Sequence, residues 1–441
     1  MTRQGTGKPA TARGYHSQLL HVMGKYFPRV GLPLMTDDKR VRWTDRLLAI
    51  VAILMVWADA TRVCDAFVTA RDVAVSMYRS RRRPGRCLGP FLERLGASTS
   101  RLLKVLVPVL RQAVMSASGS TWRWNRWVVM AVDGTRIDCP RTASNEQAFG
   151  CAGRKKTGPQ QFLTTVFHLA TGLIWDWRRG RSDASERTHL REMIGSLPDH
   201  ALLVADAGFT GYDLLRSLLV AGRDFLIRVG ANVTLLRKLG YAVREDRDTV
   251  YLWPQSKHDK EPLVLRLIQL RDDGKRCCLL TTILDRKVLS DAEAKTLYRM
   301  RWKVEVNFRS LKQTLCRRKM LSATPSNARV ELDWAMVGLC LLGLMAVDHV
   351  ARRDKTRVSV AATLRTLRQW MRRRTGRPPS KGLGGALRKA ALDRYTRRRP
   401  KEARDWPHKK RDKPPGPPKL RMATKAEVRK AKGVLDANRA A

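Results

Sequence analysis

The stretch WVVMAVDGTRI (127–137) decides the expected fold, because an apolar, β-branched run leads directly into a polar turn. Such a run is typical of a strand that is covered on both faces. A second stretch, ALLVADAGF (201–209), also begins as a wholly apolar strand and then reaches an aspartate. The two stretches predict strands of one sheet, with Asp133 at or near the end of the first and Asp206 at the end of the second.

The segments around these two strands alternate between strand and helix patterns. They are QFLTTVFHLA (161–170), LIWDWRR (173–179), SERTHLREMIGSL (185–197), YDLLRSLLVAG (212–222) and FLIRVG (225–230). Thr171-Gly172 predicts a hairpin turn, Ser185 is a candidate N-cap, and Gly222 closes the second helix. Three antiparallel strands followed by helix, strand, helix and strand predict a mixed α/β sheet.

The flanking regions have different compositions. Residues 1–120 are expected to form a helical N-terminal domain that binds DNA, with Pro108 kinking or dividing one helix. A plain helical packing domain is the alternative. Residues 121–350 would form the catalytic domain, with a β-rich insertion at about 229–288. Residues 351–441 are basic and rich in proline, and we expect this tail to be partly disordered.

The charge of the chain points to a polyanionic partner. Its 87 Lys and Arg residues face 39 Asp and Glu residues, which gives a formal net charge of +48 at pH 7. A compact protein with this charge repels itself unless a polyanion is near, and nucleic acid is the usual one. Ribosomal proteins and proteins that bind anionic membranes share this signature, so the charge selects only a class of partner.

Cysteine spacing and hydropathy predict a cytoplasmic protein. The eight cysteines form no C-x-x-C pair, so we expect no zinc site and mostly buried free thiols in a reducing compartment. The first residues lack a signal-peptide pattern. The apolar runs Leu47–Ala58 and Trp334–Val347 are shorter than the ~20 residues that span a bilayer. They predict buried core helices and no membrane partner.

The segment VLSDAEAKTLYRMRWKVEVNFRSLKQTL (288–315) predicts one long helix. Ser290 and Glu293 form a capping box that starts the helix near Asp291. At 100° per residue, four polar side chains fall in one narrow stripe: Tyr298, Arg301, Glu305 and Lys312. The adjacent stripe is apolar and should pack on the sheet; it consists of Leu297, Val304, Phe308, Leu311 and Leu315.

Two interpretations of the polar stripe are open at this point. Arg301 and Glu305 have the i, i+4 spacing of a solvated ion pair. Alternatively, Glu305 converges with Asp133 and Asp206. Converging carboxylates repel one another unless cations lie between them, and hard oxygen ligands suit Mg²⁺. Two such ions about 3.5–4 Å apart stabilise the attacking and leaving oxygens in phosphoryl transfer.

The spacing Y-x2-R-x3-E-x6-K of Tyr298, Arg301, Glu305 and Lys312 resembles the signature of the DDE transposases of bacterial insertion sequences, in the group numbered four. VDGT (132–135) is similar to the first aspartate motif of that group, and ADAGF (205–209) to the second. In the group a β-rich insertion separates the second and third carboxylates, as it appears in this sequence.

The resemblance implies a ribonuclease-H-like core in which Asp133, Asp206 and Glu305 bind two Mg²⁺ ions, with Mn²⁺ as a possible substitute. It implies that Arg301 and Lys312 hold transposon-end phosphates and that Tyr298 contacts DNA near the cut. Water would cleave the end of the element, and the freed 3′-hydroxyl would attack target DNA. The implied partners are double-stranded DNA, at the transposon ends and the target, and a second protomer in a homodimer on DNA.

Some members of the group form a DNA hairpin while a tryptophan stacks on a flipped base. Four residues are equal candidates for that tryptophan: Trp122, Trp124, Trp127 and Trp302. Two other functions use the same motifs. One is a ribonuclease-H-like nuclease that cleaves without strand transfer, and the other is a catalytically inactive DNA-binding descendant of a transposase.

Overall fold

A ten-stranded mixed sheet forms the centre of the computed structural model, which describes residues 14–26, 42–77, 84–152, 158–272, 275–395 and 416–440. The strand order is β10-β6-β7-β8-β9-β5-β4-β1-β2-β3. Strand β2 (Gln160–His168) runs antiparallel to both of its neighbours, β1 (Val128–Asp138) and β3 (Ile174–Gly180). Strands β4 (Ala201–Ala205) and β5 (Asp224–Val229) run parallel to β1.

Two short helices connect the parallel strands. Helix α6 (Glu186–Met193) joins β3 to β4, and α7 (Tyr212–Val220) joins β4 to β5. Ser185 caps α6, and Gly222 takes a left-handed φ of +64° after α7. Gly172 has a φ of +72° in the β2–β3 turn, which favours glycine. The mixed α/β class expected from the sequence is therefore confirmed.

The stretch expected to be β-rich contains four strands that extend the sheet beyond β5. They are β6 (Thr234–Arg237), β7 (Thr249–Leu252), β8 (Leu263–Asp272) and β9 (Lys275–Thr281). Strand β9 pairs with β5, so the insertion continues the central sheet instead of forming a separate one. Two helices follow β9, namely α8 (Asp291–Met300) and α9 (Lys303–Arg309).

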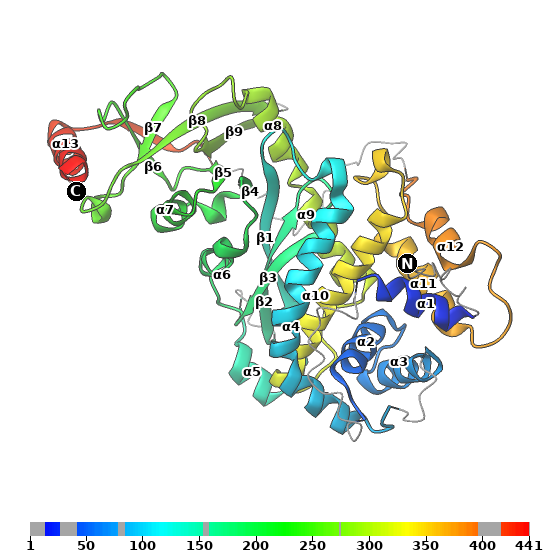
Figure 1. Cartoon of the computed structure of the whole chain (residues 1–441). Coiled ribbons are helices and arrows are strands. Elements are labelled where there is room, and N and C mark those ends of the chain that lie inside the picture. The colour runs from blue at the N-terminus through cyan, green and yellow to red at the C-terminus, as the bar shows by residue number, and fades with distance from the viewer. Residues whose placement is uncertain are drawn as a thin grey trace, which may run out of the picture.

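The remaining helices pack mainly on the side of the sheet opposite α6 and α7 (Figure 1). They are α1 (Tyr15–Gly24), α2 (Asp45–Trp57), α3 (Val63–Met77), α4 (Leu88–Ser118), α5 (Ala143–Phe149), α10 (Pro325–Asp348), α11 (Val360–Arg372) and α12 (Gly382–Ala390). Helix α4 runs through Pro108 as one helix, so this proline does not divide it.

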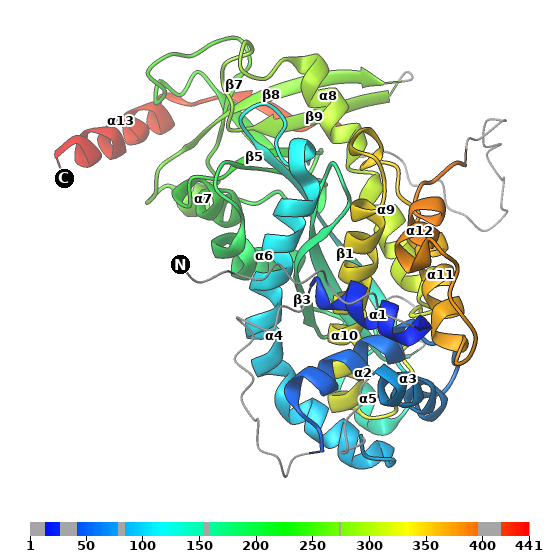
Figure 2. The same ribbon diagram turned by 45° about the vertical axis from the view of Figure 1, so that its right-hand side comes forward.

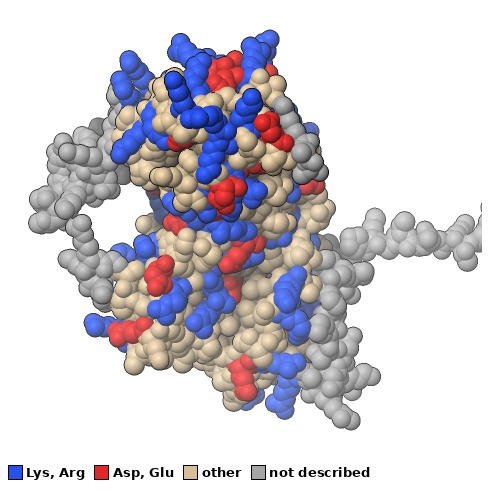
Figure 3. Space-filling model, turned by 90° about the vertical axis from the view of Figure 1, so that its left-hand side faces the viewer, with Lys and Arg blue, Asp and Glu red and all other residues tan. Residues whose placement is uncertain are grey.

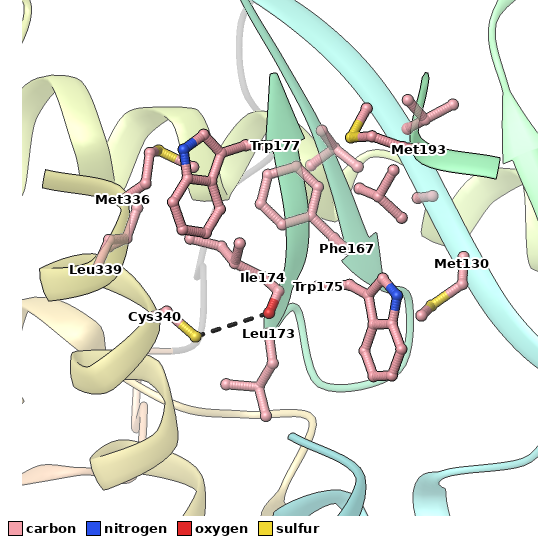
Figure 4. Close-up of a cluster of buried hydrophobic side chains, with 14 of the residues drawn as sticks. Met130, Phe167, Leu173, Ile174, Trp175, Trp177, Met193, Met336, Leu339 and Cys340 are labelled. Carbon is pink, nitrogen blue, oxygen red and sulfur yellow. Dashed lines mark hydrogen bonds between the residues drawn. The ribbon is translucent and has the colours of Figure 1, made fainter. Parts of the chain in front are cut away.

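Helix α10 is the main apolar link between the sheet and the helical region. Met336, Leu339 and Cys340 of α10 lie against the β3 side chains around Trp177 (Figure 4), and Cys340 Sγ donates a 3.7 Å hydrogen bond to the Ile174 carbonyl. By length and composition, α4 and α10 could each cross a membrane, but core helices pass the same test. In α10, 89% of the apolar window is buried in the molecule, which identifies it as a core helix.

The described parts of the basic region beyond residue 350 form helices and a strand that pack on other parts of the molecule. The rings of Tyr15 in α1 and Trp370 in α11 meet edge to face at 5.5 Å, and His16 Nε2 lies 3.0 Å from the Met371 carbonyl. Figure 2 shows α11 and α12 beside α1. Farther on, β10 (Lys419–Met422) pairs in parallel with β6, and α13 (Lys425–Ala440) follows it. The proline-rich residues 396–415 lie outside the described residues.

The cysteines only partly follow the expectation of buried thiols. Cys139, Cys278 and Cys340 are buried, whereas Cys64, Cys87 and Cys316 are exposed and the other two are half-buried. All eight are free thiols in the described structure. The expectation fails for the exposed three because they lie near the ends of helices or in a turn, where the chain is in contact with solvent.

Candidate active site

Asp133 and Asp206 stand side by side because of the register between β1 and β4. The last pair of these parallel strands is Ala131 with Val204, and each aspartate follows two residues later. Side chains at matching positions of parallel strands point to the same face. Asp206 directly follows β4 as expected, but Asp133 lies in the middle of β1, which continues to Asp138 because β2 pairs with it that far.

Local backbone hydrogen bonds orient both aspartates. Asp133 Oδ1 accepts from the Gly134 amide at 2.8 Å, and Asp206 Oδ1 accepts from the Ala207 amide at 2.7 Å. Burial raises the pKa of Asp133, and the charge of Asp206 adds to this, while the Gly134 amide and the Arg301 charge oppose it. Each aspartate therefore keeps one carboxylate oxygen with no backbone donor among the described residues.

The motif segment is two helices and a π-helical turn, where the sequence predicts one regular helix. The predicted capping box of Ser290 and Glu293 is confirmed at the start of α8. Between Arg301 and Glu305 the backbone bonds are of the i to i−3 type, and Ser310–Thr314 forms the π-helical turn. The first change overwinds the helix and the second underwinds it, so a uniform 100° per residue does not hold.

Arg301 contacts Asp133 and is not part of a solvated ion-pair row with Glu305. Its Nη1 lies 3.6 Å from Asp133 Oδ2, and only 12% of its side chain is exposed. Burial lowers the pKa of the guanidinium, but the nearby Tyr298, Asp206 and Asp133 outweigh this and raise it. The interpretation as a solvated face is therefore wrong for Arg301, because the turn at this residue directs it toward the sheet.

Glu305 lies in the first turn of α9, near both aspartates. Burial raises the pKa of its carboxyl group, Arg301 opposes this, and the like charges of Asp133 and Asp206 raise it further. The apolar stripe beside it is buried as predicted: Leu297, Val304, Phe308, Leu311 and Leu315. Packing of that stripe fixes α9 against β1 and thereby brings Glu305 to the strands.

Tyr298 and Lys312 occupy different parts of the site. The Tyr298 hydroxyl donates a 3.4 Å hydrogen bond to Asp206 Oδ1, and burial raises the pKa of the phenol to about 12. Lys312 lies in the π-helical turn, where burial lowers its pKa and the charge of Asp138 opposes this. Lys312 therefore interacts with Asp138, the last residue of β1, and not with the group around Asp133.

The carboxylates are close enough to interact electrostatically but do not form a closed ligand set. Within the described parts of the chain, no group of three or more His, Cys, Asp or Glu side chains is arranged to hold a metal ion. Of the four candidate tryptophans, Trp302 is 62% exposed, Trp127 is buried with Nε1 bonded to Asp224, and Trp122 and Trp124 are half-buried. Trp302 alone of the four presents a largely open indole.

Residues 125–342 match the family model of the transposase DDE domain. A region of 227 residues is 27% identical to the transposase InsG for insertion sequence element IS4 of Escherichia coli K12, covering 48% of this chain and 51% of that protein. The chain belongs to the DDE transposases of the IS4 type. A Sinorhizobium fredii protein, y4zB, whose name also designates it a transposase, is 34% identical over 242 residues, or 51% of this chain and 63% of that one.

The DDE transposase chain thus spans between half and two thirds of the lengths of these curated relatives. Among solved structures, the piggyBac transposase synaptic complex with hairpin DNA matches at a TM-score of 0.41 and 12% identity, over 80% of this chain and 77% of its own. The family match ends at residue 342, so α11, α12 and the β10–α13 segment lie beyond it.

One site residue of this DDE transposase is absent from the sequence-based set. Glu186, the first residue of α6, lies beside Asp133 and Asp206, whose charges act on its carboxylate. In the sequence it follows the N-cap Ser185, where an acidic residue is common because it favours the helix dipole. Because the sequence context already explains an acidic residue here, it does not indicate that Glu186 lies near the aspartates. That proximity depends on how α6 packs on the sheet.

Proposed function

We propose that the chain is a transposase that cleaves DNA at the ends of an insertion sequence and transfers the strands into target DNA by a two-metal mechanism. The observation that carries the proposal is the placement of Asp133 and Asp206 two residues beyond the last β1–β4 pair, with Glu305 brought to them by α9. The transposase DDE domain match includes all three residues and supports the proposal.

We assign the catalytic core to the ribonuclease-H-like folds. The order β3-β2-β1-β4-β5, with three antiparallel strands followed by two parallel ones, supports the assignment. The helical connections α6 and α7 and the position of α9, which carries Glu305, beside β1 support it as well. The proposed division is a DNA-binding domain at 1–120, a catalytic domain at 121–350 and a basic region at 351–441.

The donor chemistry of the site fits divalent metal ions. Carboxylate oxygens are hard ligands, and mutually repelling carboxylates are stabilised by a cation between them. We assign Asp133, Asp206 and Glu305 as ligands of two Mg²⁺ ions, for which Mn²⁺ can substitute. Their side chains must rotate toward one another to enclose an ion, since they form no closed set in the described structure. When bound, the ions supply Lewis-acid stabilisation of the attacking and leaving oxygens.

The cationic residues of the motif would position the DNA backbone. Arg301 Nε is buried and has no hydrogen-bond partner among the described residues, so it would donate to a phosphate oxygen once the side chain turns toward the DNA. Lys312, near Asp138, would hold a second phosphate farther along the strand. The Tyr298 hydroxyl orients the Asp206 carboxylate and contacts DNA at the cut, and the exposed Trp302 indole is available to stack on a base.

Double-stranded DNA, both transposon end and target, is the proposed partner of a homodimer. The net charge of +48 supports a polyanionic partner. Figure 3 shows a face on which Lys and Arg side chains crowd the part formed by the insertion and α13. With such a partner the protein acts in the cytoplasm at the nucleoid.

A strand-transfer assay tests the function. Purified protein, a duplex carrying the element's end, a target plasmid and Mg²⁺ should yield nicked ends and joined products. Asp133→Asn, Asp206→Asn and Glu305→Gln should each lose at least about 100-fold in cleavage, because loss even of groups behind the ligands costs about 10–100-fold. The exposed Asp199→Asn serves as the control. Cleavage without joined products would indicate the nuclease, and DNA binding without cleavage would indicate the inactive descendant.

A further inference from the structure

Glu186 reaches the carboxylate group from the side of the sheet opposite α9. It is the first residue of α6, whose N-cap Ser185 accepts a hydrogen bond from the Thr188 amide. Helix α6 packs against β1, β2, β3 and the turn Ala207–Phe209, so its first residue lies near the segments that follow the two aspartates. Glu186 and Glu305 therefore approach the same two strand positions from two different helices.

Two glycines leave the space that the Glu186 carboxylate fills. Gly134 directly follows Asp133, and a Cβ atom built on it would lie 2.6 Å from Glu186 Oε1. Gly208 comes two residues after Asp206, and a Cβ atom there would lie 3.3 Å from Glu186 Oε2. One carboxylate oxygen thus faces each aspartate segment. The glycines of VDGT and ADAGF are the reason that a side chain from α6 fits between them.

The Glu186 carboxylate lacks a neutralising contact in the described structure. No described residue donates a hydrogen bond to it or forms an ion pair with it. Arg187 and Arg136 attract it from a distance, but Arg187 Nε donates to the Gly208 carbonyl and Arg136 Nε to the Ser182 carbonyl. A partly buried carboxylate beside two others is unfavourable unless a cation joins the group.

We propose that Glu186 is a fourth carboxylate of the metal site and binds an ion together with Asp133 and Asp206 from the α6 side. The inference rests on the proposed function, because it requires that the two aspartates bind divalent metal. It extends that function by assigning a ligand that the Y-x2-R-x3-E-x6-K spacing and the two aspartate motifs do not contain. Gly134 and Gly208 then serve the site by giving Glu186 access.

The test measures Mn²⁺ binding to the full-length protein by isothermal titration calorimetry, without DNA. Glu186→Gln keeps the shape of the side chain and removes its charge. We expect the Kd for Mn²⁺ to rise about 10–100-fold, the range for groups that support a metal site. The control is Glu192→Gln, which makes the same change on α6 at an exposed residue that pairs with Arg178; its Kd should stay at the wild-type value.

A second measurement separates metal binding from folding. The rise in melting temperature on adding Mn²⁺ should shrink in Glu186→Gln and, to a smaller extent, in Gly208→Ala, whose Cβ atom would meet only Glu186 Oε2 among the described residues, at 3.3 Å. A role in folding alone would lower the melting temperature equally with and without Mn²⁺ and would overturn the proposal. Wild-type Mn²⁺ affinity in Glu186→Gln, together with lost affinity in Asp133→Asn, would overturn it while leaving the proposed function intact. If the wild-type protein binds no Mn²⁺, the result contradicts both the assignment of Glu186 and the proposed two-metal function.

Discussion

Arg301 and Asp133 are joined across the site, with Nη1 of the guanidinium 3.6 Å from Oδ2 of the carboxylate. The contact links the overwound turn between α8 and α9 to the middle of β1. Asp206 attracts the same guanidinium, so one arginine balances the charge of two strand carboxylates. The pair is shielded from solvent, with 12% of the arginine and 24% of the aspartate side chain exposed.

Replacing Arg301 by glutamine should impair catalysis more than DNA affinity. Asp133 would lose the group that orients it, so we expect cleavage to fall about 10–100-fold, the effect of losing a residue behind a metal ligand. DNA binding should lose one phosphate contact. The slope of log binding constant against log salt concentration, called the salt slope below, should then fall in magnitude by about 0.9. Cleavage and filter binding measure the two effects, with Arg353→Gln as control, because the Arg353 side chain is 90% exposed and pairs with Asp354. Wild-type cleavage in Arg301→Gln would contradict the assignment.

Replacing Lys312 by glutamine should weaken DNA binding without affecting the metal site, in contrast to the replacement of Arg301. The acidic charge that acts on the Lys312 ammonium group is Asp138 and not one of the three proposed ligands, so Lys312→Gln should leave Mn²⁺ affinity unchanged. Loss of one phosphate contact should lower the salt slope of DNA binding by about 0.9. Binding titrations at several salt concentrations check this against the exposed Lys287→Gln. An unchanged slope in Lys312→Gln would remove this lysine from the DNA interface.

His168 should make the protein less stable in acid. Burial lowers the pKa of this imidazole to about 4, and the ring lies between the Thr171 hydroxyl and the Trp122 carbonyl. The unfolded state has the ordinary pKa of about 6.5, so between these values it binds a proton that the folded state does not. Stability is therefore lost as the pH falls from about 6.5 to 4, by about 3 kcal/mol in total.

The matched variant for this prediction is His168→Gln, which keeps a hydrogen-bonding side chain but does not titrate. Melting temperatures at pH 7, 5.5 and 4.5 should converge between the two proteins as the pH falls, because only the wild-type protein loses the contribution of His168. Other buried histidines, including His16 and His189, titrate in both proteins and cancel in the comparison. A constant difference in melting temperature across this range would contradict the prediction.

Removal of the tail should weaken sequence-independent DNA binding, provided that the cut spares the folded part. Truncation at 354 would expose α1, because Tyr15 packs on Trp370 of α11. Deletion of 396–441 keeps α11 and α12 but also removes α13 and the edge strand β10, which pairs with β6. The variant is therefore compared only after circular dichroism shows that it is folded. Each lost phosphate contact should then lower the slope of log binding constant against log salt concentration by about 0.9. An unchanged slope after this deletion would assign the tail another role.

Assembly on DNA should be driven by charge neutralisation. At +48, two protomers repel each other at moderate salt, so we expect monomers in free solution and dimers on a duplex that carries the element's end. Light scattering at one fixed ionic strength, with and without the duplex, measures the change, and a scrambled duplex is the control. A complex that stays 1:1 and still transfers both ends would show that pairing is unnecessary.

Local patterns in the sequence were sufficient to predict several features of this protein. The capping box at Ser290, the apolar stripe around Leu311 and the strand that ends at Asp206 all depend on neighbouring residues, so they follow from spacing and hydrophobic periodicity. The order of strands and helices between β1 and β5 is local in the same sense. So is the Y-x2-R-x3-E-x6-K spacing that resembles the transposase motif.

Tertiary packing alone decided where those residues meet. The register of β1 with β4 places Asp133 beside Asp206, and the overwound turn directs Arg301 to Asp133 while Lys312 is carried toward Asp138. Glu186 reaches the site because α6 crosses the sheet over Gly134. These contacts join residues far apart in the chain, and their geometry depends on how whole elements pack, which no local period encodes.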